Sequence, residues 1–283
     1  MNESMKRQLS EFVTAGLRED VGDGDHTSLA CIDPQQQSRA KLLVKEDTVL
    51  AGMEVAEYMI HFVDPAADIE VRMKDGDQAV VGDVAFYVTM NSQALLKIER
   101  LLLNTMQRMC GVASMSKVYA DLVKDYPVKV LDTRKTTPLM RFLEKWAVSI
   151  GGCYNYRIGL FDRIMIKDNH ITASGSLSRA VKNVHQYLSA KEMKLPITLE
   201  VGSSAELDEA LDVGGFDRIM LDNFTPPQMA KAVEQINGRF EVEASGGITE
   251  SILKEVAQTG VDYISSGALT HSVVAKDLSL KIL

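Results

Sequence analysis

The chain has 283 residues, 46% of them hydrophobic and 25% charged, which is enough to fill the core of one large domain or two modest ones. Its 31 basic and 39 acidic residues give a net charge of −8, which argues against a general nucleic-acid or membrane-surface binder because both need a basic face. No apolar run approaches the roughly 18 residues of a membrane-spanning helix, and the first residues lack the apolar stretch of a secretory signal. Three scattered cysteines without a CxxC pair indicate a cytoplasmic protein with free thiols.

The first hundred residues mix helices with short strands. Apolar spacing predicts helices at 10–18, 54–62 and 92–109, and alternation predicts strands at 39–49, 69–73 and 84–90. Lys74, Asp75, Gly76 and Asp77 form a tight-turn signal before the last of these strands. We therefore expect an α+β domain, with an open sheet and helices on one face.

From about Val128 the pattern changes to short apolar strands that alternate with amphipathic segments. The predicted strands are 128–131, 163–166, 197–199, 218–221, 240–244 and 261–264. The helical segments between them are 177–188, 205–213, 229–236 and 252–258. Such alternation indicates parallel βαβ units, and because six strands fall short of the eight of a complete barrel, it predicts an incomplete α/β barrel.

Polar residues and glycines follow each of these strands, where the active sites of parallel α/β proteins lie. They are Arg134 and Lys135, then Lys167, Asn169 and His170, then Glu200, then Asp222 and Asn223, then Ser245, Gly246 and Gly247, and finally Ser265, Ser266 and Gly267. One mouth thus collects cations, two carboxylates and two glycine turns.

The two glycine turns can expose backbone N–H groups to a phosphate, or they can simply close tight βα turns. Basic residues after apolar strands favour an anionic ligand, because buried like charge is costly. Their alternative is internal pairing with Glu200, Asp222 or Asp132.

Glu200 and Asp222 end adjacent predicted strands, so their carboxylates should be neighbours. They are suited to Mg²⁺ held largely through water and substrate, or to positive charge developing on a sugar carbon. The alternative is a structural salt bridge to the basic residues. His170 and His271 each follow a strand end, where histidine serves either as a cap or in chemistry.

Eight segments spread over the chain together resemble one family. They are ERLLLNTMQRMCG, DTRKTTP, EKWAVSIGG, NYRIGL, IKDNH, MLDNF, EASGGIT and ISSGALTHS. They resemble the quinolinate phosphoribosyltransferases, and the similarity runs in order from EDVGDGDHTS to DLSLKIL. The resemblance implies an N-terminal α/β sandwich domain over residues 1–112, with the tail 273–283 packed back on it, and an incomplete, roughly seven-stranded α/β barrel over 113–272. It also implies a homodimer, or a higher oligomer built from such dimers, in which the N-terminal region of one subunit covers the barrel mouth of the other.

The resemblance implies a reaction between quinolinate and phosphoribosyl pyrophosphate (PRPP) with Mg²⁺, giving nicotinate mononucleotide, pyrophosphate and CO₂ for NAD synthesis. Arg100, Arg134 and Arg157 match the carboxylate clamps, with Arg100 donated across the dimer interface. Lys135 and Lys167 match lysines that serve the carboxylates and PRPP, and Thr133 lies in the same motif. Glu200 and Asp222 match the acidic pair near the ribose and the metal-bound pyrophosphate. The 5′-phosphate cradle matches Ser245, Gly246, Gly247, Ser266, Gly267 and His271.

Three positions depart from the family pattern. Tyr156 stands where the family usually has a histidine lining the dicarboxylate site, so its single phenolic hydroxyl is expected to substitute. Cys153 and Leu139 replace glycines in two loops, and Leu139 replaces a residue that is permitted positive φ.

Three rival functions remain at this level. A same-fold paralogue could act on another heteroaromatic acid or serve molybdate uptake. A Schiff-base aldolase could use Lys135 or Lys167, and a binding module could carry a prosthetic group on Lys74.

Overall fold

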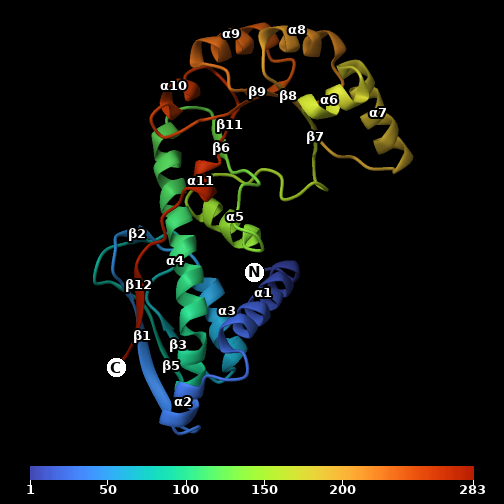
Figure 1. The fold of residues 1–283 in the computed structure, drawn as a ribbon. Helices are drawn as coiled ribbons and strands as arrows, with labels where there is room; N and C mark the ends of the chain where they lie inside the picture. The colour runs from blue at the N-terminus through green and yellow to red at the C-terminus, as the bar shows by residue number, and fades with distance from the viewer. The chain divides into compact units, whose positions relative to one another are not determined.

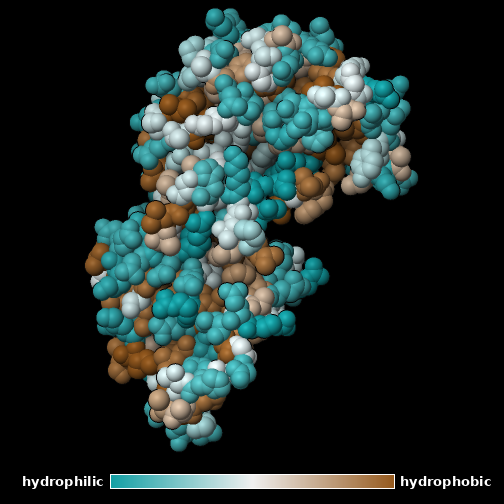
Figure 2. Space-filling view, in the orientation of Figure 1, coloured by the Kyte–Doolittle hydropathy of each residue, from teal (hydrophilic) through white to brown (hydrophobic).

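The computed structural model describes residues 1–283, and the chain divides into two compact units. Unit 1 comprises residues 1–117, 136–152 and 272–283, and unit 2 comprises residues 118–135 and 153–271. No helix is both long enough and apolar enough to cross a membrane. Figure 2 shows hydrophobic residues in scattered groups among hydrophilic ones on the visible face of each unit. The domain boundary at residues 112 and 113 stays a prediction.

Unit 1 is built on a four-stranded antiparallel sheet in the order β12-β1-β5-β3 (Figure 1). Its strands are β1 (Gln37–Val44), β3 (Asp68–Val71), β5 (Val84–Asn91) and β12 (Leu278–Ile282), and β2 (Thr48–Val49) pairs separately with β4 (Gln78–Ala79). Ala40, Leu42 and Val44 alternate along β1 and are fully buried, so one face of the sheet is covered. The segment from the end of the chain thus forms an edge strand beside β1.

The helices of unit 1 begin at clear capping signals. Asn2 and Asp25 accept backbone N–H groups of Met5 and Ser28 at the starts of α1 (Glu3–Val21) and α2 (His26–Cys31). The others are α3 (Met53–Val63), α4 (Ser92–Val123), whose last turns belong to unit 2, and α5 (Arg141–Ile150).

Unit 2 contains a six-stranded parallel sheet in the order β6-β11-β10-β9-β8-β7. Its strands are β6 (Lys129–Leu131), β7 (Ile164–Ile166), β8 (Ile197–Val201), β9 (Arg218–Asp222), β10 (Glu241–Ser245) and β11 (Tyr263–Ser265). Edge strands β6 and β7 do not pair with each other; beside β6 there is only a single parallel bridge, between Leu131 and Tyr154. The incomplete α/β barrel is therefore confirmed, with six full strands and one bridge.

Helices follow the strands of unit 2. They are α6 (Asp168–Ser174), α7 (Leu177–Ala190), α8 (Ser204–Val213), α9 (Pro226–Ile236), α10 (Leu253–Ala257) and α11 (Ala268–His271). Four of them, α7 to α10, lie over the predicted helical segments, whereas α6 and α11 were not predicted. Ser176 and Ser203 cap α7 and α8 by accepting backbone N–H groups of Arg179 and Glu206. The buried residues of α7, α8 and α9 include Ala180, Leu207 and Met229.

Several elements differ from the predicted bounds, among them α1, α4 and β1. Helix α1 begins at Glu3 instead of residue 10. Helix α4 continues through Gly111 to Val123 instead of ending at residue 109. A Cβ at Gly111 would collide with the carbonyl oxygen of Val274. This glycine serves close approach rather than helix termination. The predicted strand 39–49 is divided into β1 and β2, and Lys45 between them donates its backbone N–H to the carbonyl of Asp277.

Candidate functional site

A cavity of about 460 Å³ in unit 2 opens at the carboxyl ends of the parallel strands. It brings together all the residues that the family resemblance assigns to the site except Arg100. Its predicted lining comprises Thr133, Arg134, Lys135, Tyr156, Arg157, Lys167, Glu200, Asp222, Ser245, Gly246, Gly247, Ser266, Gly267 and His271. Met165, Met220, Ile248, Thr249, Ser265 and Ala268 also line it. The parallel register explains the convergence, because corresponding strand ends meet at one edge of the sheet.

Two arginines at the mouth form a concentrated positive region. Burial lowers the pKa of Arg157, and the nearby positive charge of Arg134 lowers it further. Both side chains are half-buried. Two planar guanidinium groups in one cavity suit a ligand with two carboxylates or with phosphate groups.

The two predicted carboxylates lie on adjacent strands. Glu200 is on β8 and Asp222 ends β9, and these strands pair directly. Lys167 donates from Nζ to Glu200 Oε2, so the internal pairing that the sequence left open is present. Asp222 Oδ2 accepts from the side-chain amide of Asn223 at 2.8 Å. No group of three or more His, Cys, Asp or Glu side chains converges as a metal site, so the pair could hold Mg²⁺ only with oxygens from ligand and water.

The turn after β10 brings bare backbone close to its neighbours. Gly246 has φ +91°, and a Cβ there would lie 2.7 Å from the backbone nitrogen of Asn223. Gly247 has φ +60° with open space around it. Asn223 is itself left-handed at φ +59° and donates its backbone N–H to the carbonyl of Ser245 at 2.9 Å. Glycine at 246 is therefore required by both conformation and space.

The turn after β11 brings a lysine and a histidine over a third glycine. A Cβ on Gly267 would lie 2.6 Å from Cδ2 of His271 and 2.9 Å from Cδ of Lys135. The hydroxyl of Thr270 donates to the carbonyl oxygen of Lys135 at 2.8 Å, which ties the two loops together. Only a residue without a side chain at 267 leaves both groups at the cavity.

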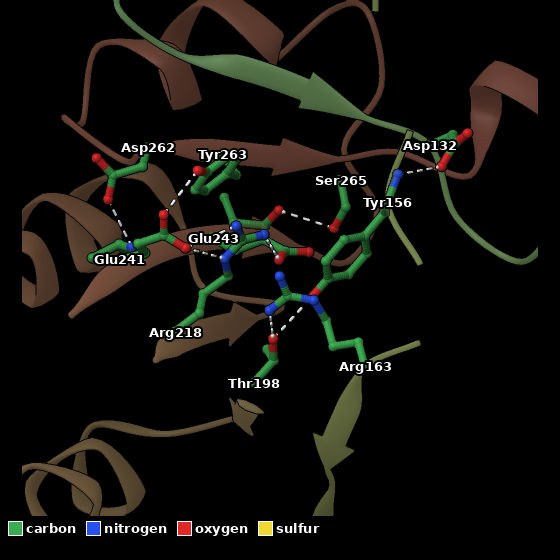
Figure 3. A network of polar contacts seen from close by, with 12 residues as sticks. Asp132, Tyr156, Arg163, Thr198, Arg218, Glu241, Glu243, Asp262, Tyr263 and Ser265 are labelled. Carbon is green, nitrogen blue, oxygen red and sulfur yellow. Dashed lines mark hydrogen bonds and ion pairs between the residues drawn. The ribbon is translucent and has the colours of Figure 1, made fainter. Parts of the chain in front are cut away.

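Tyr156 is anchored at both ends. Its backbone N–H donates to Asp132 Oδ1 at 2.8 Å, and its hydroxyl lies 2.9 Å from Oγ1 of Thr198, which is fully buried (Figure 3). Burial and the nearby Glu243 carboxylate raise the pKa of Tyr156 to about 12, so the phenol is neutral at physiological pH.

Two predicted residues lie elsewhere. Arg100 is exposed on α4 in unit 1 and lines a separate cavity of about 460 Å³ with residues of α1 and the loop 137–140. His170 accepts the backbone N–H of Lys167 at 3.0 Å through Nδ1 and so caps α6. Of the two interpretations of His170, the structure supports capping.

The barrel also contains a charged network that the sequence analysis did not predict. Arg218 donates to Glu241 at 2.9 and 3.0 Å and to Glu243 at 3.0 Å, and it packs 3.6 Å from the ring centroid of Tyr263 (Figure 3). The signal was present in the strands RIMLD and EVEAS, where charged residues occupy alternate positions on the face that carries Asp222 and Ser245.

The matches to known proteins cover nearly the whole chain. Residues 25–110 match the family described as quinolinate phosphoribosyl transferase, N-terminal domain, and residues 112–281 match its C-terminal domain. Quinolinate phosphoribosyltransferase [decarboxylating] 1b of Nicotiana tabacum is 43% identical, over 97% of this chain and 82% of the relative. The probable nicotinate-nucleotide pyrophosphorylase [carboxylating] of Bacillus subtilis is 38% identical, over 97% and 93%.

Solved structures agree with the sequence matches. NadC from Streptococcus pyogenes superposes with a TM-score of 0.89 at 38% identity, covering 98% of this chain and 97% of that one. The nicotinate-nucleotide pyrophosphorylase from Francisella tularensis gives 0.90 at 33% identity over 98% and 97%. The fold, the convergence of the motifs on one cavity and these matches lead to a single conclusion: the chain belongs to the quinolinate phosphoribosyltransferase family.

Proposed function

We propose that this protein transfers the phosphoribosyl group of PRPP to quinolinate with decarboxylation, releasing nicotinate mononucleotide, pyrophosphate and CO₂ for NAD synthesis. The observation that carries the proposal is the cavity of unit 2, which joins a pair of arginines, two lysines, two carboxylates and two glycine turns. The arginines suit the two carboxylates of quinolinate, and the glycine turns suit a 5′-phosphate.

In the proposed reaction the pyridine nitrogen attacks C1 of the ribose while pyrophosphate leaves. Glu200 and Asp222 stabilise the positive charge that develops on the sugar, and Lys135 faces the departing negative charge. Lys167 pairs with Glu200, which keeps that carboxylate oriented and shielded until substrate arrives. The 2-carboxylate then leaves as CO₂ because the quaternised ring nitrogen accepts its electron pair.

Arg134, Arg157 and Tyr156 border the quinolinate subsite in this proposal. The 5′-phosphate contacts Ser245, Gly246, Gly247, Ser266, Gly267 and His271, with Thr133 at the base of the lysine loop. Mg²⁺ would be held by pyrophosphate oxygens and water, with Glu200 and Asp222 as indirect partners, and when bound it supplies charge neutralisation of the leaving group.

We further propose a cytoplasmic homodimer with shared sites, in which Arg100 serves the cavity of the other subunit. Its exposure on α4 supports this role. Mixing an inactive Arg100→Ala subunit with an inactive Glu200→Gln subunit should restore activity, because the heterodimer contains one site with both residues intact. A mixture that stays inactive although heterodimers form contradicts the shared site.

The direct test supplies PRPP and Mg²⁺ with quinolinate, and nicotinate in a parallel reaction. Nicotinate mononucleotide and CO₂ formed only from quinolinate would support the proposal. Activity with nicotinate alone would mean that the dicarboxylate site recognises a monoacid. Absence of product with both acids would favour the paralogue acting on another heteroaromatic acid.

A further inference from the structure

Two cavities of unit 2 share one wall. The first, the upper cavity, lies at the carboxyl ends of the strands. The second, of about 340 Å³, is lined by Lys129, Arg218 and Tyr263, the first residues of β6, β9 and β11. The two therefore lie at opposite ends of the parallel strands. Tyr156 and Arg157 line both.

Tyr156 separates these cavities with its ring rather than with its hydroxyl. The phenol oxygen is bonded to Thr198, which is fully buried and lines neither cavity. The Nη1 of Arg163 donates to the same Thr198 hydroxyl at 3.0 Å, so this oxygen pair is held from a second side. What Tyr156 offers to the upper cavity is therefore an aromatic surface.

The Tyr156 ring rests on an arginine that cannot easily move. The guanidinium groups of Arg218 and Arg163 lie 5.4 and 5.3 Å from the Tyr156 centroid (Figure 3). Of the two, Arg218 is held by charged partners, because its N–H groups bond Glu241 and Glu243 and it lies 3.6 Å from the Tyr263 centroid. Its side chain is 5% exposed. A planar guanidinium fixed by two carboxylates is a rigid support for a ring.

The charged groups of this network contact one another. Arg218 bonds both Glu241 and Glu243, and Arg163 contributes to lowering the pKa of Glu241. These bonds hold the Arg218 guanidinium in place beside the Tyr156 ring.

We propose that Arg218 is a positioning residue, which holds the Tyr156 ring as the floor of the upper cavity so that the pyridine substrate packs against the ring instead of bonding to the phenol oxygen. The identity of that substrate rests on the proposed function. The support of Tyr156 by Arg218 does not, because it follows from contacts within the free protein.

The test uses two pairs of variants. Tyr156→Ala removes the floor and Tyr156→Phe keeps it, so KM for quinolinate should rise about tenfold more in the alanine variant, because the phenylalanine variant loses only the internal hydrogen bond to Thr198. Arg218→Met is made together with Glu243→Gln, which avoids a buried carboxylate without its partner. This double variant should raise KM for quinolinate about tenfold while KM for PRPP stays within about twofold.

Arg239→Met is the matched control, because Arg239 also combines a hydrogen bond, to the Leu211 carbonyl, with an aromatic contact, to Phe240, outside both cavities. It should lower the melting temperature without changing either KM. Hydrogen–deuterium exchange of residues 154–158 supplies a readout independent of turnover. The double variant should accelerate exchange of the Tyr156 amide, and the control should not.

Equal KM increases for Tyr156→Phe and Tyr156→Ala would overturn the proposal, because they would assign recognition to the hydroxyl. Unchanged exchange at Tyr156 in the Arg218 double variant would overturn it as well. A wild-type protein that is inactive with quinolinate would refute the proposed function instead, and the exchange measurement would still decide whether Arg218 holds Tyr156.

Discussion

Replacing Glu200 by Gln tests whether its carboxylate serves catalysis or the stability of the fold. The side chain of Glu200 is 16% exposed and that of its partner Lys167 is 39% exposed. A partly exposed ion pair of this kind contributes about 1 kcal/mol to the free energy of unfolding, and glutamine keeps the shape and one acceptor. Loss of a preorganised group that stabilises transition-state charge costs about 10²–10³ in kcat, or about 3–4 kcal/mol.

The assay compares kcat, at saturating PRPP and quinolinate, with unfolding in urea for the same preparation. Asp222→Asn should behave like Glu200→Gln, because Asp222 ends the neighbouring strand at the same mouth. Glu206→Gln is the matched control: its carboxylate accepts the Gly202 N–H at 2.8 Å but does not line the cavity. It should leave kcat unchanged.

A variant that loses stability more than it loses kcat would refute the reasoning. If Glu200→Gln lowered the free energy of unfolding by about 3 kcal/mol or more and reduced kcat less than tenfold, the Lys167 pair would be structural and the charge argument would fail. A similar loss of kcat in Glu206→Gln would show that net charge near the mouth, rather than a particular carboxylate, controls the rate.

Three further predictions concern other parts of the chain. Burial raises the pKa of Cys110 and of Cys153 to about 12, so both thiols stay protonated at pH 8, and alkylation followed by mass spectrometry should label only the exposed Cys31 until the protein is unfolded. Arg108→Met should lower the free energy of unfolding by about 3–5 kcal/mol, because Glu144 is fully buried and loses its 2.9 Å partner; adding Glu144→Leu should recover much of this loss, and an additive double variant would contradict the argument. Gly246→Ala should weaken PRPP binding in calorimetry, whereas Gly238→Ala, also at positive φ but with open space around it, should cost only stability, so equal PRPP affinity in the two variants would contradict the close-approach argument.

Much of unit 2 could be predicted because each strand and helix carries its own local signal. All six apolar runs became strands, and the residues after them converge on one cavity because parallel register aligns their ends. The role of Gly111 inside α4 could not be predicted, since the carbonyl of Val274 that approaches it is distant in the sequence. The division of the strand 39–49 likewise reflects pairing with a segment near residue 277.

The interior charges illustrate a different limit. Arg218 and Glu243 occupy alternate positions in strands that were recognised, yet an alternating charged residue in a barrel strand reads equally well as an exposed one. Only the pairing of β9 with β10, which puts Arg218 opposite Glu241, brings Arg218 and Glu243 to the same face of the sheet, where they bond. The hydroxyl of Tyr156 was expected at the substrate and lies instead on Thr198, a partner that no local pattern identifies.

The pairing of β12 with β1 has a consequence for the order in which the protein can fold. Ala40 lies opposite Ile282, so the sheet of unit 1 gains its outer strand only after all six strands of unit 2 have been synthesised. Until then β1 keeps an unpaired edge, which is a template for association with other chains. Unit 1 therefore depends on a late contact of very long sequence separation, whereas neighbouring strands β7 to β11 of unit 2 follow one another in the sequence.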